Sequence, residues 1–122
     1  MTLSSAPQTW TLEMAAGSLQ EYLFTFTYPS TGALYPIGGS WEYVADNAAG
    51  SQVISVTGTA NSQGVLTIGT AASTVQLNLY PGATSSLGGQ QCTHALWQNP
   101  GSADSAYCWF SGPLIVGVTA QP

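Results

Sequence analysis

Residues 21–28 read EYLFTFTY, and this stretch decides the fold class. Aromatic residues occupy its even positions from Tyr22 to Tyr28, while leucine or threonine stands at the odd positions between them. A period of two is the pattern of a β-strand that turns one face to the core and the other to solvent. The stretch therefore predicts a half-buried strand and not a helix.

The same alternation recurs along the rest of the chain. Upstream, Trp10, Leu12 and Met14 alternate with polar residues. Further runs are rich in threonine, valine, isoleucine and aromatic residues, which are favoured in strands. These runs are residues 41–45, 52–57, 65–68, 74–79, 92–97, 106–110 and 114–119. Helical spacing is hard to find, and residues 81–87 could form one short helical turn.

Turn-forming residues separate the predicted strands. They are the segments 29–32 (PSTG), 38–39 (GG), 47–50 (NAAG), 61–64 (NSQG) and 99–101 (NPG). Proline presets φ there, and glycine or asparagine accepts a positive φ. Strands that recur about every 8 to 14 residues are typical of an antiparallel sandwich or small barrel. We therefore expect a single all-β domain over residues 1–122.

The chain contains no lysine and no arginine, and its five acidic residues give a formal net charge of −5. Phosphates and anionic membrane surfaces are bound by basic side chains, so we expect neither nucleic acid nor a membrane as partner. No apolar run approaches the ~20 residues of a membrane-spanning helix. A nearly uncharged surface also favours a place in a larger assembly, because isolated soluble domains usually rely on interspersed charges.

The first seven residues, MTLSSAP, lack the basic and apolar regions of a secretory signal. We therefore expect a product made in the cytoplasm. A mature secreted protein whose signal had been replaced by Met1 would look the same, so that alternative stays open.

Cys92 and Cys108 lie on successive predicted strands, symmetrically about Pro100. A symmetric hairpin would place them nearly opposite each other, which fits a disulfide. Two reduced, buried thiols are the usual state in the cytosol and fit as well. His94 would share a strand face with Cys92, so these three residues could supply three zinc ligands. Structural zinc normally takes four ligands, so we assign no metal site and expect no cofactor.

Catalytic patterns are missing from the chain. Glu42 and Asp46 would share a strand face, but outward-facing carboxylates are ordinary on strands. The sequence has one histidine, no G-x-S-x-G motif and no phosphate-binding loop. Without a cationic side chain, an anionic transition state has no charged partner. We therefore expect a protein that is not an enzyme.

The chain has four tryptophans, six tyrosines and three phenylalanines. Most follow the strand alternation, so the core of a sandwich accounts for them. Tyr35, Trp97 and Tyr107 lie near predicted loops instead and are the better candidates for an exposed contact surface. Such rings could stack on sugars, and this supports the alternative hypothesis of a secreted or displayed ligand-binding β-domain that recognises carbohydrate.

Several segments follow one another in a recognisable order. The order begins with an apolar strand, a tight connection at Gly17 and the strand 21–27. Five more segments follow: 39–44 (GSWEYV), 64–68 (GVLTI), 77–87 (LNLYPGATSSL), 92–97 (CTHALW) and 110–116 (FSGPLIV). This order resembles small Ig-like β-sandwich domains in tailed-phage virions, of the type at the N-terminus of baseplate upper proteins. The chain departs from that pattern at Val44 and Ala45, where basic residues are usual, and over residues 92–96, where an acid is usual.

The resemblance implies an antiparallel Ig-like β-sandwich of about seven to nine strands. We expect residues 1–7 to form a flexible N-terminal arm. It implies a structural protein of the virion, made in the host cytoplasm: a minor tail, baseplate or capsid decoration protein. Such a protein docks on a larger virion protein through an edge strand or a loop face. We also expect homo-oligomers, because a nearly uncharged surface offers little like-charge repulsion.

Overall fold

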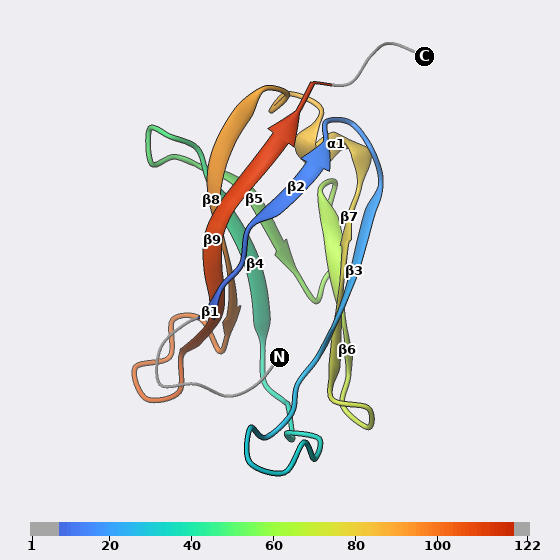
Figure 1. The fold of residues 1–122 in the computed structure, drawn as a ribbon, viewed down its shortest axis with the longest axis vertical. Coiled ribbons are helices and arrows are strands. Elements are labelled where there is room, and N and C mark those ends of the chain that lie inside the picture. The colour runs from blue at the N-terminus through green and yellow to red at the C-terminus, as the bar shows by residue number, and fades with distance from the viewer. Residues whose placement is uncertain (1–7, 119–122) are drawn as a thin grey trace.

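The structure, a computed structural model, describes residues 8–118 and is nearly all-β, with 52% strand and 4% helix (Figure 1). Its strands are β1 (Gln8–Thr9), β2 (Leu12–Ala15), β3 (Gln20–Thr25), β4 (Trp41–Asp46), β5 (Gln52–Thr57), β6 (Gly64–Gly69), β7 (Thr74–Leu79), β8 (Gln90–Gln98) and β9 (Tyr107–Gly117). The short helix α1 (Pro81–Thr84) forms where one helical turn is predicted. The predicted N-terminal arm, residues 1–7, lies outside the described residues.

The strands form two sheets, in which most neighbours are antiparallel. The larger sheet has the order β1-β9-β8-β4-β5, and β2 continues along β9 beyond β1. The smaller sheet has the order β3-β7-β6 and lies beside the larger one (Figure 1). The expected all-β fold is therefore confirmed, and the two sheets are consistent with a β-sandwich.

The alternating residues of the strands meet between the two sheets. The EYLFTFTY stretch forms β3 and the residues after it, and there Phe26 is fully buried whereas Leu23 is 64% exposed. The larger sheet contributes alternate residues of β4, among them Tyr43, which is also fully buried. Large aromatic side chains make up much of this core, and each of them removes a large apolar area from water. The largest fully buried side chains include Trp109, Tyr43, Phe26 and Phe110.

The strand β9 is continuous where the sequence predicts two strands, 106–110 and 114–119. Its central residues Gly112 and Pro113 lie opposite the break between β1 and β2. Pro113 has no N–H to donate to a neighbouring strand. A Cβ on Gly112 would collide with the backbone carbonyl oxygen of Trp10. Gly112 and Pro113 therefore coincide with a break in the partner of β9 and not in β9 itself.

The pairing of β1 and β2 with β9 is parallel, which the strand pattern does not predict. Gln8 pairs with Phe110, and Leu12 pairs with Leu114. The N-terminal and C-terminal strands of the described chain thus close one edge of the larger sheet together (Figure 1).

The hairpin of β8 and β9 is not centred on Pro100, and this separates the two cysteines. Cys92 pairs with Leu114, whereas Cys108 pairs with Trp97. Trp97 lies about five residues along β8 from Cys92, a rise of about 16 Å, while bridged cysteines need Cα atoms within about 7 Å. This register excludes the disulfide between Cys92 and Cys108. Both are free thiols, and Cys92 is buried.

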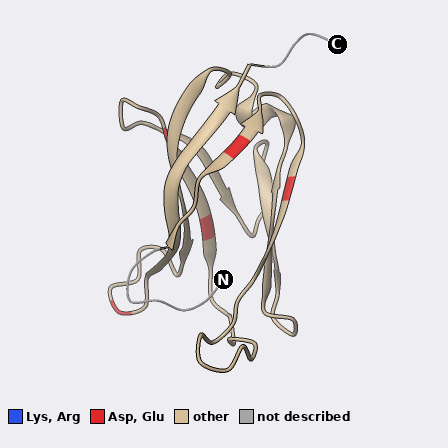
Figure 2. Ribbon diagram, in the orientation of Figure 1, with Lys and Arg blue, Asp and Glu red and all other residues tan. Residues whose placement is uncertain are grey.

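The acidic residues are spread over the molecule. Figure 2 shows them on β2, β3, β4 and the connection between β8 and β9. Within residues 8–118, no helix is long and apolar enough to cross a bilayer.

Candidate functional site

A small hairpin in the connection between β3 and β4 carries two tyrosines. The Tyr28 N–H donates to the Ala33 carbonyl at 2.8 Å, and the Tyr35 N–H donates to the Phe26 carbonyl at 2.9 Å. At the turn, Gly32 has a φ of 70°, a left-handed conformation that glycine adopts without steric cost. The predicted PSTG turn is therefore the tip of this hairpin. It brings the ring centroids of Tyr28 and Tyr35 to 5.1 Å from each other.

The start of β9 supplies two more rings through a β-bulge. Leu96 pairs with Phe110 and Trp97 pairs with Cys108, so Trp109 is the extra residue between these pairs. The bulge lets the neighbouring side chains of Trp109 and Phe110 both be buried, which strict alternation would not allow.

The rings from the two connections meet at Trp109. The Tyr107 centroid lies 4.8 Å from that of Trp109 at an interplanar angle of 67°. The Tyr35 centroid lies 5.6 Å from that of Trp109 at 71°. Both tyrosine rings are half-buried and stand steeply against the indole. Edge-to-face contacts of this kind hold aromatic rings in defined orientations.

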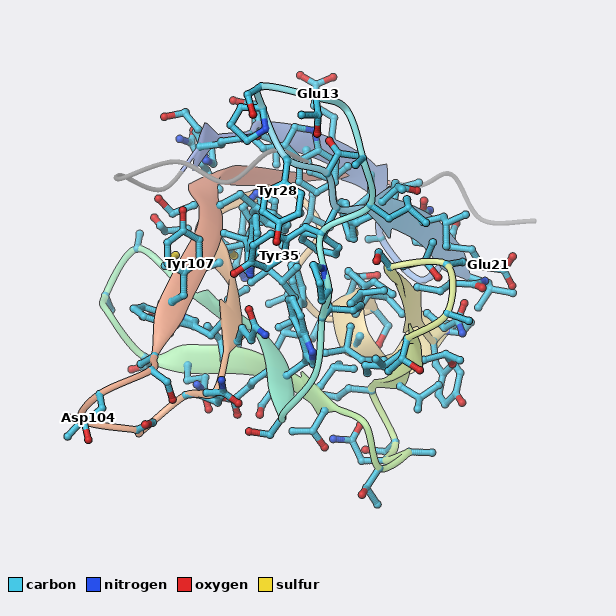
Figure 3. All side chains as sticks on the ribbon, turned by 90° about the horizontal axis from the view of Figure 1, so that it is seen from below. Glu13, Glu21, Tyr28, Tyr35, Asp104 and Tyr107 are labelled. Carbon is cyan, nitrogen blue, oxygen red and sulfur yellow. The ribbon has the colours of Figure 1, made fainter. Side chains whose placement is uncertain are left out.

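These rings line a cavity of about 310 Å³, which we call the loop-end pocket. Its lining residues are Tyr35, Gln98, Asn99, Asp104, Ser105, Ala106, Tyr107 and Trp109. Figure 3 shows Tyr28, Tyr35 and Tyr107 gathered together, while Asp104 lies at the outer tip of its loop, away from them.

Hydrogen bonds tie the two connections that form the pocket. The Trp109 indole N–H donates to Gln98 Oε1 at 3.1 Å, and Gln98 Nε2 donates to the Gly38 carbonyl at 3.0 Å. Asn99 Oδ1 accepts from the Ser40 N–H at 3.1 Å, and the Asn99 N–H donates to the Ser40 carbonyl at 2.7 Å. Hydrogen bonds within the chain therefore hold the walls of the pocket in place without a ligand.

The predicted contact residues divide into two groups. The structure brings Tyr35 and Tyr107 into the loop-end pocket, but Trp97 is not part of it. Trp97 follows the buried Leu96 on β8 and is half-exposed. Trp109 is not among the predicted contact residues; it is buried, but its ring also lines the pocket. Its two-residue spacing from Tyr107 was the available signal.

A second group of interest surrounds His94, which is 1% exposed. Its Nε2 lies 2.7 Å from the Trp10 carbonyl oxygen, which can only accept, so Nε2 carries the proton. Nδ1 then accepts from the Tyr43 hydroxyl at 2.8 Å. Burial lowers the pKa of His94, and the hydrogen bond to Trp10 opposes that shift. Burial also raises the pKa of Tyr43, so this pair stays neutral.

Within residues 8–118, the cysteines and acids form no metal-binding group. Burial raises the pKa of the Cys92 thiol and of the Cys108 thiol, which disfavours the reactive thiolate. No group of three or more histidine, cysteine, aspartate or glutamate residues within 8–118 could hold a metal ion. Glu42 accepts a hydrogen bond from Ser55 Oγ at 3.1 Å, and Asp46 lies at the exposed end of β4. Neither carboxylate faces the loop-end pocket.

No known protein-family model matches the chain, and no curated protein matches it.

Proposed function

We propose that the protein is a non-enzymatic structural component of a tailed-phage virion that docks on a larger virion protein and is present in repeated copies. Minor tail, baseplate and capsid decoration proteins all fit this description. The resemblance of the segment order to Ig-like virion domains supports the proposal. So does the nearly uncharged surface, which suits packing against neighbouring subunits.

The strand order supports the Ig-like part of the proposal. In immunoglobulin variable domains, strands B, E and D lie in one sheet, and strands G, F, C and C′ lie in the other. The order β3-β7-β6 corresponds to the first sheet, and the order β9-β8-β4-β5 corresponds to the second.

One exposed sheet edge, that of β5, is already occupied by side chains. Gln63 Oε1 accepts from the Ser55 N–H at 2.8 Å, and Gln63 Nε2 donates to the Val53 carbonyl at 2.8 Å. Asn61 Nδ2 donates to the Ser55 carbonyl at 2.9 Å. These amides take the place of a neighbouring strand, so β5 is poorly suited to pairing with a partner.

The β3 edge has a different character, and it is the observation that carries the proposal. Within the described sheets, β3 pairs with β7 alone. Leu19, just before the strand, is 55% exposed, and Leu23 is 64% exposed. Edge strands are usually guarded by charged residues, but Glu21 is the one charged residue of β3. An edge with exposed leucines is suited to strand addition or apolar docking by a partner.

Incorporation into particles tests both the role in the virion and docking through β3. Tagged protein is expressed during infection, the particles are purified, and the tag is located by immunogold labelling. We expect wild-type protein in intact particles and about tenfold less of the Leu23→Glu variant, a loss of about 1.4 kcal/mol. Thr67→Glu is the matched control, because Leu23 pairs with Gln76 and Gln76 pairs with Thr67 in the same row of the sheet.

The outcomes separate the virion from the docking edge. Absence of wild-type protein from purified particles would contradict a role in the virion. Equal incorporation of Leu23→Glu and wild type would contradict docking through β3 while leaving the virion assignment in place. Size-exclusion chromatography of the purified protein tests the expected homo-oligomer.

A further inference from the structure

The loop-end pocket has no role in docking through β3, yet it has the features of a ligand site. Its volume of about 310 Å³ is at the lower end of the range for small-molecule sites, about 300 to 1,000 Å³. Gln98 and Asn99 fix its two connections through hydrogen bonds, so it is formed without a ligand. We propose that this pocket binds an uncharged saccharide, with one pyranose ring against Tyr35 and Tyr107.

The chemistry of the walls indicates an amphipathic ligand. Tyr35 and Tyr107 stand steeply against Trp109, so the pocket offers ring surfaces in two orientations. A pyranose has apolar C–H faces that can pack on such rings and a rim of hydroxyls that requires hydrogen bonds. Tyrosine combines an apolar ring with a polar tip and therefore matches both parts of the sugar.

Apart from Asp104, the polar groups at the pocket are neutral donors and acceptors. Asn99 uses its amide oxygen on Ser40, which leaves its amide N–H groups to donate to a ligand. Ser105 already shares a hydrogen bond with Ser102 at 2.8 Å and helps to shape the loop. Connections rich in tyrosine, serine, glycine and asparagine are also characteristic of the binding loops of antibodies.

The distribution of charge argues against ionic ligands. The chain has no lysine or arginine, so an anionic ligand would have no charged partner in the pocket. Asp104 is the one acid in the lining, but its side chain lies at the loop tip, apart from Tyr35 and Tyr107 (Figure 3). A cation would therefore have one carboxylate partner, on the loop side of the pocket. A neutral polyhydroxylated ligand requires no charged partner.

The test uses the full chain and saturation-transfer NMR, followed by titration for dissociation constants. The neutral probes are the methyl glycosides of glucose, galactose, mannose and N-acetylglucosamine, and the ionic probes are glucuronate and tetramethylammonium. Variants are Tyr35→Ala and Tyr107→Ala, with Tyr35→Phe and Tyr107→Phe in case an alanine variant does not fold. Tyr80→Ala is the matched control, because Tyr80 is also half-buried but precedes α1 (Pro81–Thr84) at the other end of the sheets (Figure 1).

We expect at least one neutral glycoside to bind wild type and Tyr80→Ala equally. Loss of either pocket ring should weaken that binding about tenfold, whereas the phenylalanine variants keep the ring and should lose less. The proposal is overturned if none of the neutral glycosides binds, if glucuronate or tetramethylammonium binds more tightly than all of them, or if Tyr80→Ala weakens binding as much as the pocket variants do. None of these results bears on incorporation through Leu23.

Discussion

His94 is a buried, neutral group whose two ring nitrogens both have partners. Nε2 donates to the Trp10 carbonyl, and Nδ1 accepts from the Tyr43 hydroxyl. A proton on Nδ1 would place two donors against each other unless the Tyr43 hydroxyl turned away. The ring also stacks on Trp10, at 5.4 Å between centroids. The neutral residue therefore links β8 and β4 to the chain between β1 and β2, and protonation would require the Tyr43 hydroxyl to reorient.

This arrangement predicts a loss of stability in mild acid. Burial lowers the pKa of folded His94 below the ordinary value of about 6.5, so the unfolded chain binds the proton more readily. Stability is therefore full above about pH 6.5 and falls as the pH drops through that value toward the lower folded pKa, by up to about 1.4 kcal/mol per pH unit. Urea denaturation between about pH 7 and about pH 5 measures this slope.

His94→Gln provides the control for that slope. The chain has one histidine, so the variant should be less stable than wild type at neutral pH but nearly independent of pH over the same interval. An equal slope in wild type and variant would show that another group is responsible.

At the scale of elements, the hydrogen bonds from Gln63 to the edge of β5 predict that this side chain stabilises and protects the edge. Replacing it with alanine removes both amide hydrogen bonds, to Ser55 and to Val53, and uncovers the strand edge. We expect Gln63→Ala to lower the free energy of unfolding by about 1 to 3 kcal/mol. We also expect concentration-dependent self-association in size-exclusion chromatography, because an uncovered edge can pair with another chain.

Gln91→Ala is the comparison for this change. Gln91 is an exposed residue of β8, an inner strand of the larger sheet, and its loss should change stability by no more than about 0.5 kcal/mol. If the two variants are equally stable and their apparent size depends on concentration in the same way, the side-chain amide of Gln63 does not protect the edge.

The elements also show which parts of the fold can be predicted from local sequence. Alternation in EYLFTFTY predicts strand β3 because side-chain period depends on neighbouring residues alone. Register depends on distant residues, so the offset of the β8 and β9 hairpin, and with it the separation of Cys92 from Cys108, could not be predicted. The parallel pairing with β9 and the break opposite Pro113 are non-local in the same way.

At the scale of the whole molecule, two residues of the candidate site could be predicted from sequence, but their arrangement could not. Tyr35 and Tyr107 could be selected from sequence because both lie near predicted loops. That they meet at Trp109 depends on a bulge in β9 and on two connections that lie side by side. Trp97 satisfied the same sequence criterion, but it follows the buried Leu96 and does not line the pocket.

The absence of lysine and arginine makes stability nearly independent of salt, because residues 8–118 hold no side-chain ion pair that salt could screen while His94 is neutral. The five acids are dispersed (Figure 2), so their mutual repulsion is small as well. We predict that the free energy of unfolding at pH 7 changes by less than about 0.5 kcal/mol between about 0.05 M and about 0.5 M sodium chloride. Denaturation in urea, which is uncharged, measures it without adding ions. A loss of stability above about 1 kcal/mol over this range would contradict a fold held by apolar packing and neutral hydrogen bonds.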